Sequence, residues 1–569
     1  MLSPVDKYRA TLILCFCKNF LNSTSLYALM KGRVTMKKSK AITFGLASAA
    51  TAAGLAYYVK EKLHDDDFKD RLKTVAGDGL SKVLEGVDTL LPKLPWPDID
   101  DYTSENFYAG HEKFNDASVK GAKWQLGYAR ASLVPSDFES KDYYLGGFLT
   151  NPPGIVKSIL DDQAVRVVCL DDGSGRGAAV FAVIDCIGLS STDVRTVRSM
   201  LKQFAQENNI VSINISATHC HSAIDTQGIW GVLPDMLKNN VKEIKKGRPQ
   251  NTISGRDPEF MKNLHSKTSE AVKEAFNSMK KGKLLYKTFD DLKYSRDKRK
   301  PEVLVKDITK IHFIPDDGSA ETVAALMAAH PTALDSKVGE LSADYIYYIE
   351  EEVKKAGSNF IFFQGPQLAI AVDRGIVPEG AQGRGFQEYG RTIGKYLLSI
   401  TAEQEEKVLP ILNIRSKEVF VPAGNMILLT VLKAGIVNNI VVKTGKKAKD
   451  VRFVTEIGYT EIGKNLRFAM IPGEMAPELL LGGTLTAAES CNGTSWDFPP
   501  MKDMLADGTN LVVIGLCNDS IGYILPDNDY GCIFAENHYE EAVSAGPETA
   551  STLVGAFEKL VDSCGRLVK

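Results

Sequence analysis

The chain has 569 residues, of which 44% are hydrophobic, so it can bury a large core as one large domain or as two or three smaller ones. Its 68 basic and 71 acidic residues give a net charge of −3, and no long basic block supports a nucleic-acid partner. The nine cysteines lack the CxxC spacing typical of zinc sites, and their loose spacing makes a poor disulfide framework.

Residues 1–60 are predicted to be a targeting or anchor segment. An uncharged run from Ala41 to Val59 is just long enough to cross a hydrocarbon layer of about 30 Å as a helix. Lysines before this run favour an orientation that places the rest of the chain outside the cytoplasm. We therefore expect a membrane-anchored, extracytoplasmic protein, with secretion after signal cleavage as the alternative. Met36 is a natural alternative start, because typical signal regions follow it.

Residues 61–118 are expected to form an amphipathic helix and a proline-rich linker. Charged and apolar positions alternate at helical spacing over 66–91, and three closely spaced prolines follow. The segment is therefore predicted to connect the uncharged amino-terminal run to a folded domain.

Residues 119–569 have the pattern of one mixed α/β domain. Two β-branched runs joined by DDGSGR predict a hairpin, since the turn lacks the helix and the Lys-Ser/Thr pair of a phosphate-binding loop. An amphipathic helix is predicted over 191–209, with Ser191 or Thr192 as its N-cap. The run VSINISA then predicts a strand that ends at Thr218.

Two histidines, His219 and His221, follow this strand directly in the sequence THCHS. Residues i and i+2 of an extended chain point to the same side, so both imidazoles can face one site. Such a pair at a strand end is a recurrent metal-ligand geometry, and a zinc site needs about four ligands. The alternative is two hydrogen-bonded polar residues at the start of a loop.

The chain has eight histidines, so further candidate ligands are few. His330 ends an apolar run before a proline, which predicts the end of a buried element. Four others, His64, His111, His265 and His312, are predicted to be surface or edge residues.

Five segments in order resemble the neutral/alkaline, non-lysosomal ceramidase family, whose members are zinc-dependent amidases that split ceramide into sphingosine and fatty acid. THCHS is similar to the THTHS segment of the family. The other four segments are WQLGYARASLVPSDF, AAHPTAL, FAMIPGEMAPELLLGG and NDSIGYILPDNDYGCIFAENHYEEAVSAGPETA. Together the matches span roughly residues 120–555 and resemble a divergent, bacterial-type member. The resemblance implies a large mixed α/β catalytic domain with sheets flanked by helices and zinc at strand ends.

The resemblance also implies a zinc centre with four protein ligands. These would be His219, His330, Glu474 of the PGE segment and Tyr523. Two imidazoles, a carboxylate and a phenolate that leave a position for water or substrate suit a catalytic site. Taken alone, Glu474 could cap the following helix, and Tyr523 could be a half-buried strand residue.

Further family roles fall on residues around this centre. His221 and Tyr539 would contact the substrate as catalytic residues, and Arg296 lies where the family places an arginine, with Arg299 as a rival. Gln364 and Gly365 stand in the segment that would bind the substrate.

The sequence also departs from the family in that segment. Gly365 stands where the family has a serine with an assigned catalytic role, and losing such a hydrogen-bond donor costs about a hundredfold in rate. Ala223-Ile224-Asp225 replaces family glycines after the histidine pair. About thirty residues follow Tyr539, so we expect no carboxyl-terminal β-sandwich domain.

The sequence therefore predicts a zinc-dependent, ceramidase-like hydrolase of an amide bond in a lipid-like substrate. A hydrolase of another amide or ester in the same superfamily is one alternative. A catalytically degenerate envelope protein that binds metal or lipid is the other, and the glycine at position 365 is the feature that favours it.

Overall fold

A computed structural model describes seven ranges of the chain: 96–148, 151–290, 295–372, 385–445, 450–505, 510–531 and 538–568. The predicted membrane run and the predicted amphipathic helix over 66–91 lie outside these ranges. None of the helices in the described ranges is both long and apolar enough to span a membrane.

The larger sheet of the described chain has nine strands in the order β11-β9-β8-β6-β1-β3-β4-β5, with β13 paired to β6. Most neighbours are antiparallel, but β4–β5 and β9–β11 are parallel. The strands are β1 (Trp124–Ser132), β3 (Ala164–Asp171), β4 (Ala178–Ile184), β5 (Ile210–Ala217), β6 (Lys280–Asp290), β8 (Asp307–Pro315), β9 (Thr322–Met327), β11 (Asn359–Gln364) and β13 (Glu406–Val408).

A second sheet of five strands packs face to face on the first. Its order is β14-β16-β17-β19, with β15 paired to β16. The strands are β14 (Leu412–Pro422), β15 (Val441–Lys443), β16 (Val451–Ile462), β17 (Leu466–Met470) and β19 (Leu511–Ile514). One apolar cluster takes side chains from both sheets and forms the core between them.

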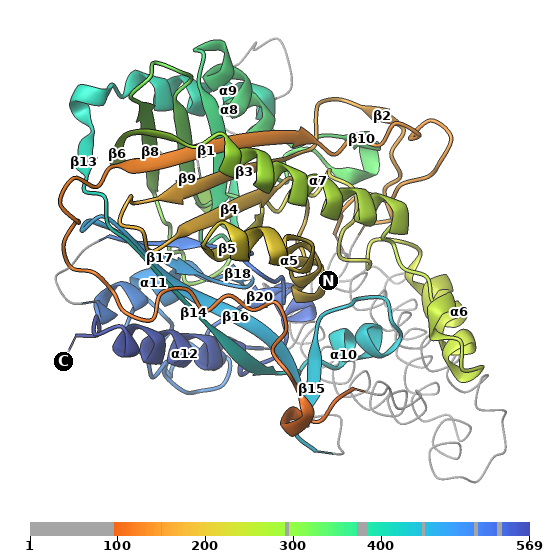
Figure 1. The fold of residues 1–569 in the computed structure, drawn as a ribbon. Helices are drawn as coiled ribbons and strands as arrows, with labels where there is room; N and C mark the ends of the chain where they lie inside the picture. Colours follow the sequence, from red (N-terminus) through yellow and green to blue (C-terminus); the bar gives the residue numbers. More distant parts are fainter. Residues whose placement is uncertain are drawn as a thin grey trace, which may run out of the picture.

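Helices cover the outer faces of both sheets, so the molecule has four layers, helix–sheet–sheet–helix (Figure 1). Against the first sheet lie α5 (Ser191–Glu207), α7 (Pro258–Asn277), α8 (Tyr345–Lys355) and α9 (Gly385–Ser399). Against the second lie α10 (Met426–Lys433), α11 (Pro477–Leu481) and α12 (Thr549–Ser563), while α6 (Leu233–Lys245) extends to the side. Because the central strands are covered on both faces, their sequences are continuously apolar, as in β4. The mixed α/β architecture predicted from the sequence is confirmed.

The larger sheet curls so that its two ends meet. The Phe181 ring on β4 meets the Phe363 ring on β11 at 6.4 Å, and Gln364 at the end of β11 donates from Nε2 to the carbonyl of Thr218, directly after β5, over 3.1 Å. The segments after β5, β9 and β11 therefore come together, although β5 and β11 stand at opposite ends of the strand order.

Three two-stranded ladders complete the fold. They are β2 (Ser158–Ile159) with β10 (Glu340–Leu341), β7 (Ser295–Asp297) with β12 (Ile370–Val372), and β18 (Glu474–Met475) with β20 (Tyr523–Ile524). The β7–β12 ladder borders the segment after β9, because Ala371 of β12 forms a bridge with His330. The β18–β20 ladder borders the segment after β11, because the Leu368 amide donates to the Met475 carbonyl.

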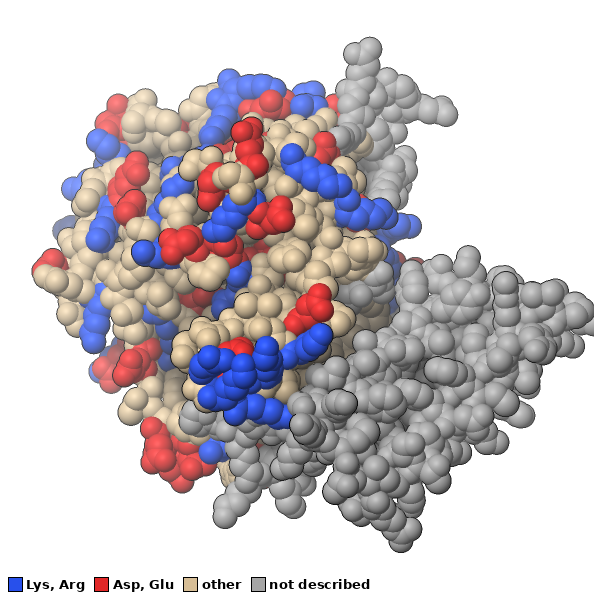
Figure 2. Space-filling view, turned by 90° about the vertical axis from the view of Figure 1, so that its right-hand side faces the viewer, with Lys and Arg blue, Asp and Glu red and all other residues tan. Residues whose placement is uncertain are grey.

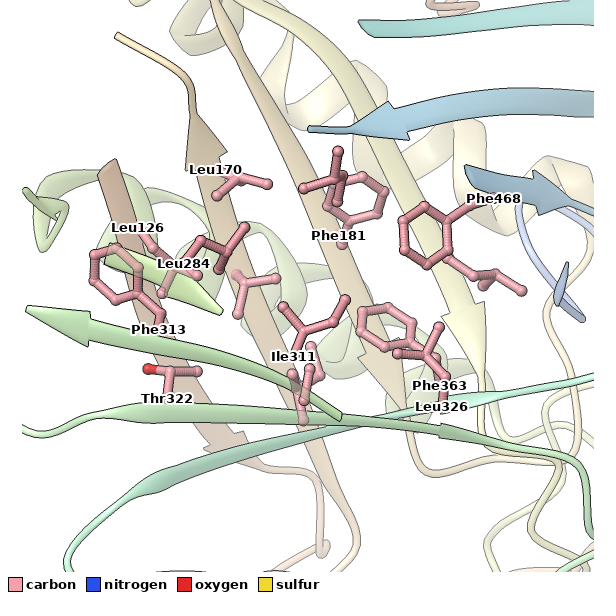
Figure 3. A pocket seen from close by; sticks show the side chains of 15 residues that line it. Leu126, Leu170, Phe181, Leu284, Ile311, Phe313, Thr322, Leu326, Phe363 and Phe468 are labelled. Carbon is pink, nitrogen blue, oxygen red and sulfur yellow. The ribbon is translucent and has the colours of Figure 1, made fainter. Parts of the chain in front are cut away.

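The core between the sheets contains an apolar cavity of about 60 Å³. Side chains of the first sheet, such as Phe181 and Phe363, face Phe468 of the second across it (Figure 3). Thr322 is the one polar residue among the fifteen that line it.

The predicted hairpin and helix are both present, but the helix is capped one residue earlier than predicted. Strands β3 and β4 form the predicted antiparallel hairpin, and Gly173 and Gly175 in its turn adopt positive φ. Helix α5 begins at Ser191, but its N-cap is Ser190, whose side chain accepts a hydrogen bond from the Asp193 amide. Both predicted caps were therefore placed too late in the chain. Residues 96–118 run along the second sheet, where the His111 amide donates to the Ile414 carbonyl.

Candidate metal centre

Three histidines converge where the ends of the larger sheet meet. His219 and His221 follow β5, and His330 follows β9. One ring nitrogen from each lies within 4.8 Å of the other two, and all three side chains are buried. This group could hold a metal ion.

Backbone carbonyls fix the orientation of two of these rings. His219 Nδ1 lies 2.6 Å from the Ile187 carbonyl, and His330 Nδ1 lies 2.9 Å from the Ile370 carbonyl. A carbonyl only accepts, so each Nδ1 donates, and when Nε2 carries no proton its lone pair points toward the centre. Metal-binding histidines are typically held in this way.

Glu474 supplies a carboxylate to the same point. Its Oε2 lies 3.1 Å from His219 Nε2 and 2.9 Å from His330 Nε2. Burial opposes the charge of Glu474, but the two imidazoles outweigh it and lower its pKa to about 2. A carboxylate oxygen and two lone-pair nitrogens would repel one another if the rings are neutral, so a cation among them satisfies all three. The donor set therefore fits a divalent metal such as zinc.

Tyr523 lies beside Glu474, since the two are register partners in the parallel β18–β20 ladder. Burial first, and then the charge of Glu474, raise the pKa of Tyr523 well above its usual value. Its ring centroid lies 6.4 Å from that of His330. The four residues suggested as zinc ligands are thus neighbours in the structure, and Glu474 stands on a strand and does not cap helix α11, whose N-cap is Ala476.

His221 also belongs to this cluster. Its Nε2 is 3.0 Å from His219 Nε2, and its ring stacks on Phe148 with 4.5 Å between centroids. Burial, followed by the two neighbouring histidines, lowers the pKa of His221 well below its usual value. The side chain is therefore neutral near pH 7 and available as a ligand or as a proton acceptor.

Tyr539 lies next to Tyr523, with 6.5 Å between the ring centroids. It is half-buried and directly precedes a short 3-10 helix, Glu540–Val543. Tyr523 therefore lies near both His330 and Tyr539.

The two candidate arginines have different surroundings. Arg299 is buried and forms ion pairs with Asp529, Glu540 and Glu541, which fixes the segment that carries Tyr539. Arg296 is exposed on β7, where its register partner is Ala371 of β12, the residue that bridges to His330. Arg296 is thus near the centre and accessible, whereas the charge of Arg299 is balanced within the protein.

Gln364 joins the segments that carry the histidines. Its Nε2 donates to the carbonyls of Thr218 and Ala329, each the residue before a histidine, and its Oε1 accepts from the Ala329 amide. These contacts hold the two histidine segments together, and the substrate-binding role suggested by the sequence stays a prediction. A Cβ added to Gly365 would lie only 3.1 Å from Ala328 Cβ, so a side chain there requires the neighbouring segment to move.

An apolar pocket of about 220 Å³ opens beside the centre. Phe148, which stacks on His221, forms one part of its wall, and Trp230, Ile229 and Leu233 form another. Most of the side chains that line the pocket are apolar, and Asn151 is the polar one among them.

A basic surface lies next to this pocket, on helix α6, whose first residues also line the pocket wall. Lysines and arginines gather on this face of the molecule (Figure 2). The exposed basic residues are Lys238, Lys242, Lys245, Lys246 and Arg248.

Sequence reasoning missed several features of the site and its surroundings. The backbone carbonyls of Ile187 and Ile370, which orient His219 and His330, could not be identified from the sequence, because every residue has a carbonyl. His111 and His312 are buried, so their prediction as surface or edge residues was wrong. His312 is buried because both of its ring nitrogens are paired with glutamates, Glu405 and Glu321.

No protein-family model and no curated protein matches the chain. Two solved structures do match its fold. A crystal structure of neutral ceramidase from Pseudomonas aeruginosa matches with a TM-score of 0.58 and 13% identity, over 79% of this chain and 76% of that one. A ceramidase complexed with C2 matches with a TM-score of 0.58 and 14% identity, over 78% and 75% of the two chains. The resemblance noted in the sequence is thus confirmed at the level of the fold, which this chain shares with neutral ceramidase.

Proposed function

We propose that this chain is a zinc-dependent hydrolase that cleaves an amide bond in a lipid-like substrate, as a ceramidase does. The observation that carries the proposal is the convergence of His219, His330 and Glu474 on one buried point within a neutral ceramidase fold. Buried, oriented imidazoles around a carboxylate are typical of a metal-dependent hydrolase.

His219, His330, Glu474 and Tyr523 would hold the zinc. When bound, the metal supplies a Lewis acid for the scissile carbonyl and lowers the pKa of a water molecule. The neutral imidazole of His221 is placed to accept a proton beside the scissile bond. The Tyr539 hydroxyl can donate to the substrate carbonyl, and the exposed Arg296 can bind a polar group of the substrate.

The apolar pocket favours a lipid-like substrate. Its wall reaches His221 through Phe148, so an acyl chain in the pocket would bring its carbonyl carbon toward the centre. Each methylene group removed from water contributes about 0.8 kcal/mol of binding free energy.

A lipid substrate would also explain a link to a membrane. We propose that the protein is anchored by its amino-terminal segment with the hydrolase domain outside the cytoplasm, and that the basic face of α6 lies on an anionic lipid surface. Binding of the protein to vesicles containing phosphatidylserine, with loss of binding at high salt, tests the second part. Equal binding to neutral vesicles would contradict it.

Gly365 favours a second candidate, a hydrolase of another amide or ester, or a binding protein without turnover. The family serine is absent there, and Ala328 leaves little space for a replacement. The remaining groups can still support hydrolysis, because a zinc site can deliver water without a serine.

The deciding experiment is fatty-acid release from ceramide by the purified, zinc-loaded chain, with and without a chelator. Release that the chelator abolishes is the expected result. Zinc binding without release of fatty acid would mean that the substrate is another amide or ester, which a panel of acyl substrates would identify. A chain that binds no zinc and cleaves none of the panel would overturn the proposal. His265→Ala is the matched control, since His265 lies on α7 beside Asp193, outside the histidine cluster.

A further inference from the structure

A second group of reactive side chains lies outside the metal centre. Cys491, His538 and Glu541 come from two separate segments, and His538 directly precedes Tyr539. Of the described cysteines, Cys491 is exposed, four are buried and Cys564 is half-buried. The proposed hydrolase function uses none of these three residues.

The three side chains form a line with a defined direction of proton transfer. Cys491 Sγ lies 3.1 Å from His538 Nε2, and His538 Nδ1 lies 2.5 Å from Glu541 Oε1. A carboxylate only accepts, so Nδ1 donates to Glu541, and the lone pair of Nε2 faces the thiol. A nucleophile, a base and a group that orients the base are the parts of an activated nucleophile site.

The orienting carboxylate is held firmly. Glu541 is completely buried, and it accepts hydrogen bonds from Arg299 Nη2 at 3.0 Å and from the Gly531 amide at 3.1 Å. His538 and Arg299 outweigh the effect of burial and lower the pKa of Glu541, so it is charged. Glu541 thereby fixes His538 in one tautomer, so the imidazole needs no reorganisation when the reaction occurs.

A glycine brings the backbone close to the pair. A Cβ at Gly531 would lie 2.6 Å from His538 Cε1 and 3.0 Å from Cys491 Sγ. No larger residue fits there without displacing the imidazole or the thiol.

The charges around Cys491 determine how it can react. Partial burial, followed by Asp529 and Glu541, raises the pKa of the thiol to about 11, with Arg299 opposing them. The thiol is therefore protonated near pH 7, and attack requires His538 to take the proton as the new bond forms. Reactivity should depend on the imidazole, unlike that of a free thiolate.

A metal site explains the same pair less well. The carboxylate of Glu541 contacts Nδ1, on the side of the ring away from the thiol. Among the described residues, the one group of three potential metal ligands is the histidine cluster. Two ligands do not make a zinc site.

We propose that Cys491 is a nucleophilic thiol that accepts acyl groups from esters and thioesters, with His538 as its base and Glu541 as the positioning residue. The sulfur attacks the carbonyl carbon, the Sγ proton moves to His538 Nε2, and an S–C bond forms. The bond to the alkoxide or thiolate leaving group breaks, and that group takes the proton from His538. The product is a thioester on Cys491.

The test uses the full chain and p-nitrophenyl acetate, with acetylated peptides quantified by mass spectrometry. Cys491 is expected to be acetylated at least about tenfold faster than the half-buried Cys564, which serves as the internal control. Because a general base contributes about 10²- to 10⁴-fold, His538→Gln should slow acetylation of Cys491 about a hundredfold or more. Equal rates for the two cysteines, or an unchanged rate in His538→Gln, would overturn the proposal.

Two further variants guard against misfolding and against confusion with the metal centre. Cys491→Ser alters an exposed residue, so the fold should persist while labelling of this position by the acyl donor falls sharply. His219→Ala should leave acetylation of Cys491 unchanged, because the thiol site does not depend on the metal centre. If His219→Ala lost the acetylation of Cys491, the reaction would depend on the metal centre, which would contradict an independent thiol site.

Discussion

Two buried clusters of histidine and glutamate in this molecule use the same residue types in opposite ways. In the candidate metal centre, Nδ1 of His219 and of His330 donates to a backbone carbonyl, and Nε2 of each faces Glu474. In the other cluster, both ring nitrogens of His312 face carboxylates, Glu405 at 2.8 Å and Glu321 at 2.9 Å.

The difference appears in the charge that each cluster favours. Burial opposes protonation of His312, but Glu405 and Glu321 outweigh it and raise its pKa. Burial dominates at His330 and lowers its pKa, although Glu474 opposes the shift. A histidine with two carboxylates is a cation in an ion pair, whereas a histidine held by a carbonyl keeps a lone pair for a metal.

The largest difference in zinc content and activity is expected between two variants, each of which removes the carboxylate of one cluster. Glu474→Ala should lower zinc affinity and hydrolytic activity by more than about a hundredfold, since Glu474 is a proposed zinc ligand and not only a partner of one. Glu405→Ala should keep the zinc, because Glu405 contacts His312 and Lys310 and none of the clustered histidines. Zinc content by mass spectrometry and activity decide the comparison. Full zinc content in Glu474→Ala would show that the metal centre is assigned wrongly.

His312→Gln should destabilise the fold in a pH-dependent way. A charge-assisted hydrogen bond contributes about 1.5–3 kcal/mol to stability. Most of this stabilisation should come from the buried Glu405, because Glu321 is partly exposed. The folded pKa is raised, so the stabilisation is full below the unfolded pKa of about 6.5 and is lost as pH rises through the folded pKa. The free energy of unfolding in denaturant at pH 6 and pH 9 measures this. A larger gap between variant and wild type at pH 9 would contradict it.

Gln364→Ala should weaken the metal centre without removing a ligand. Gln364 holds the backbone on the amino side of both His219 and His330, and loss of such support typically costs about 10- to 100-fold in metal affinity. A zinc titration against a competing chelator measures the change. Gln387→Ala, on helix α9, is the control and should leave zinc affinity unaltered.

Gly365→Ser is expected to have the smallest effect and to act through packing. A side chain 3.1 Å from Ala328 Cβ should cost about 1–3 kcal/mol of stability, which Ala328→Gly should partly relieve. Melting temperatures of the single and double variants measure this coupling. A fully stable Gly365→Ser with a marked gain of amidase activity would instead mean that the pocket still accommodates the family serine.

The sequence predicted the position of the histidine pair better than the contacts that hold it. The HxH motif was predicted to follow a strand, and His219 and His221 do follow β5, whereas the alternative interpretation of Glu474 as a helix cap is wrong because Glu474 lies on β18. The contacts of Gln364 and the pairing of His312 could not be predicted, because they depend on long-range curling of the sheet and on partners distant in the sequence. Local patterns report local structure, whereas this site joins His219 to Glu474, more than 250 residues apart in the sequence.

The cavity between the sheets makes the fold sensitive to hydrostatic pressure. Space lined by leucine, isoleucine and phenylalanine tends to stay dry, and unfolding lets solvent occupy the volume. The unfolded state then has the smaller partial volume, so compression favours it. Filling the space at Ala324, which lines it, should raise the pressure at which half of the molecules unfold.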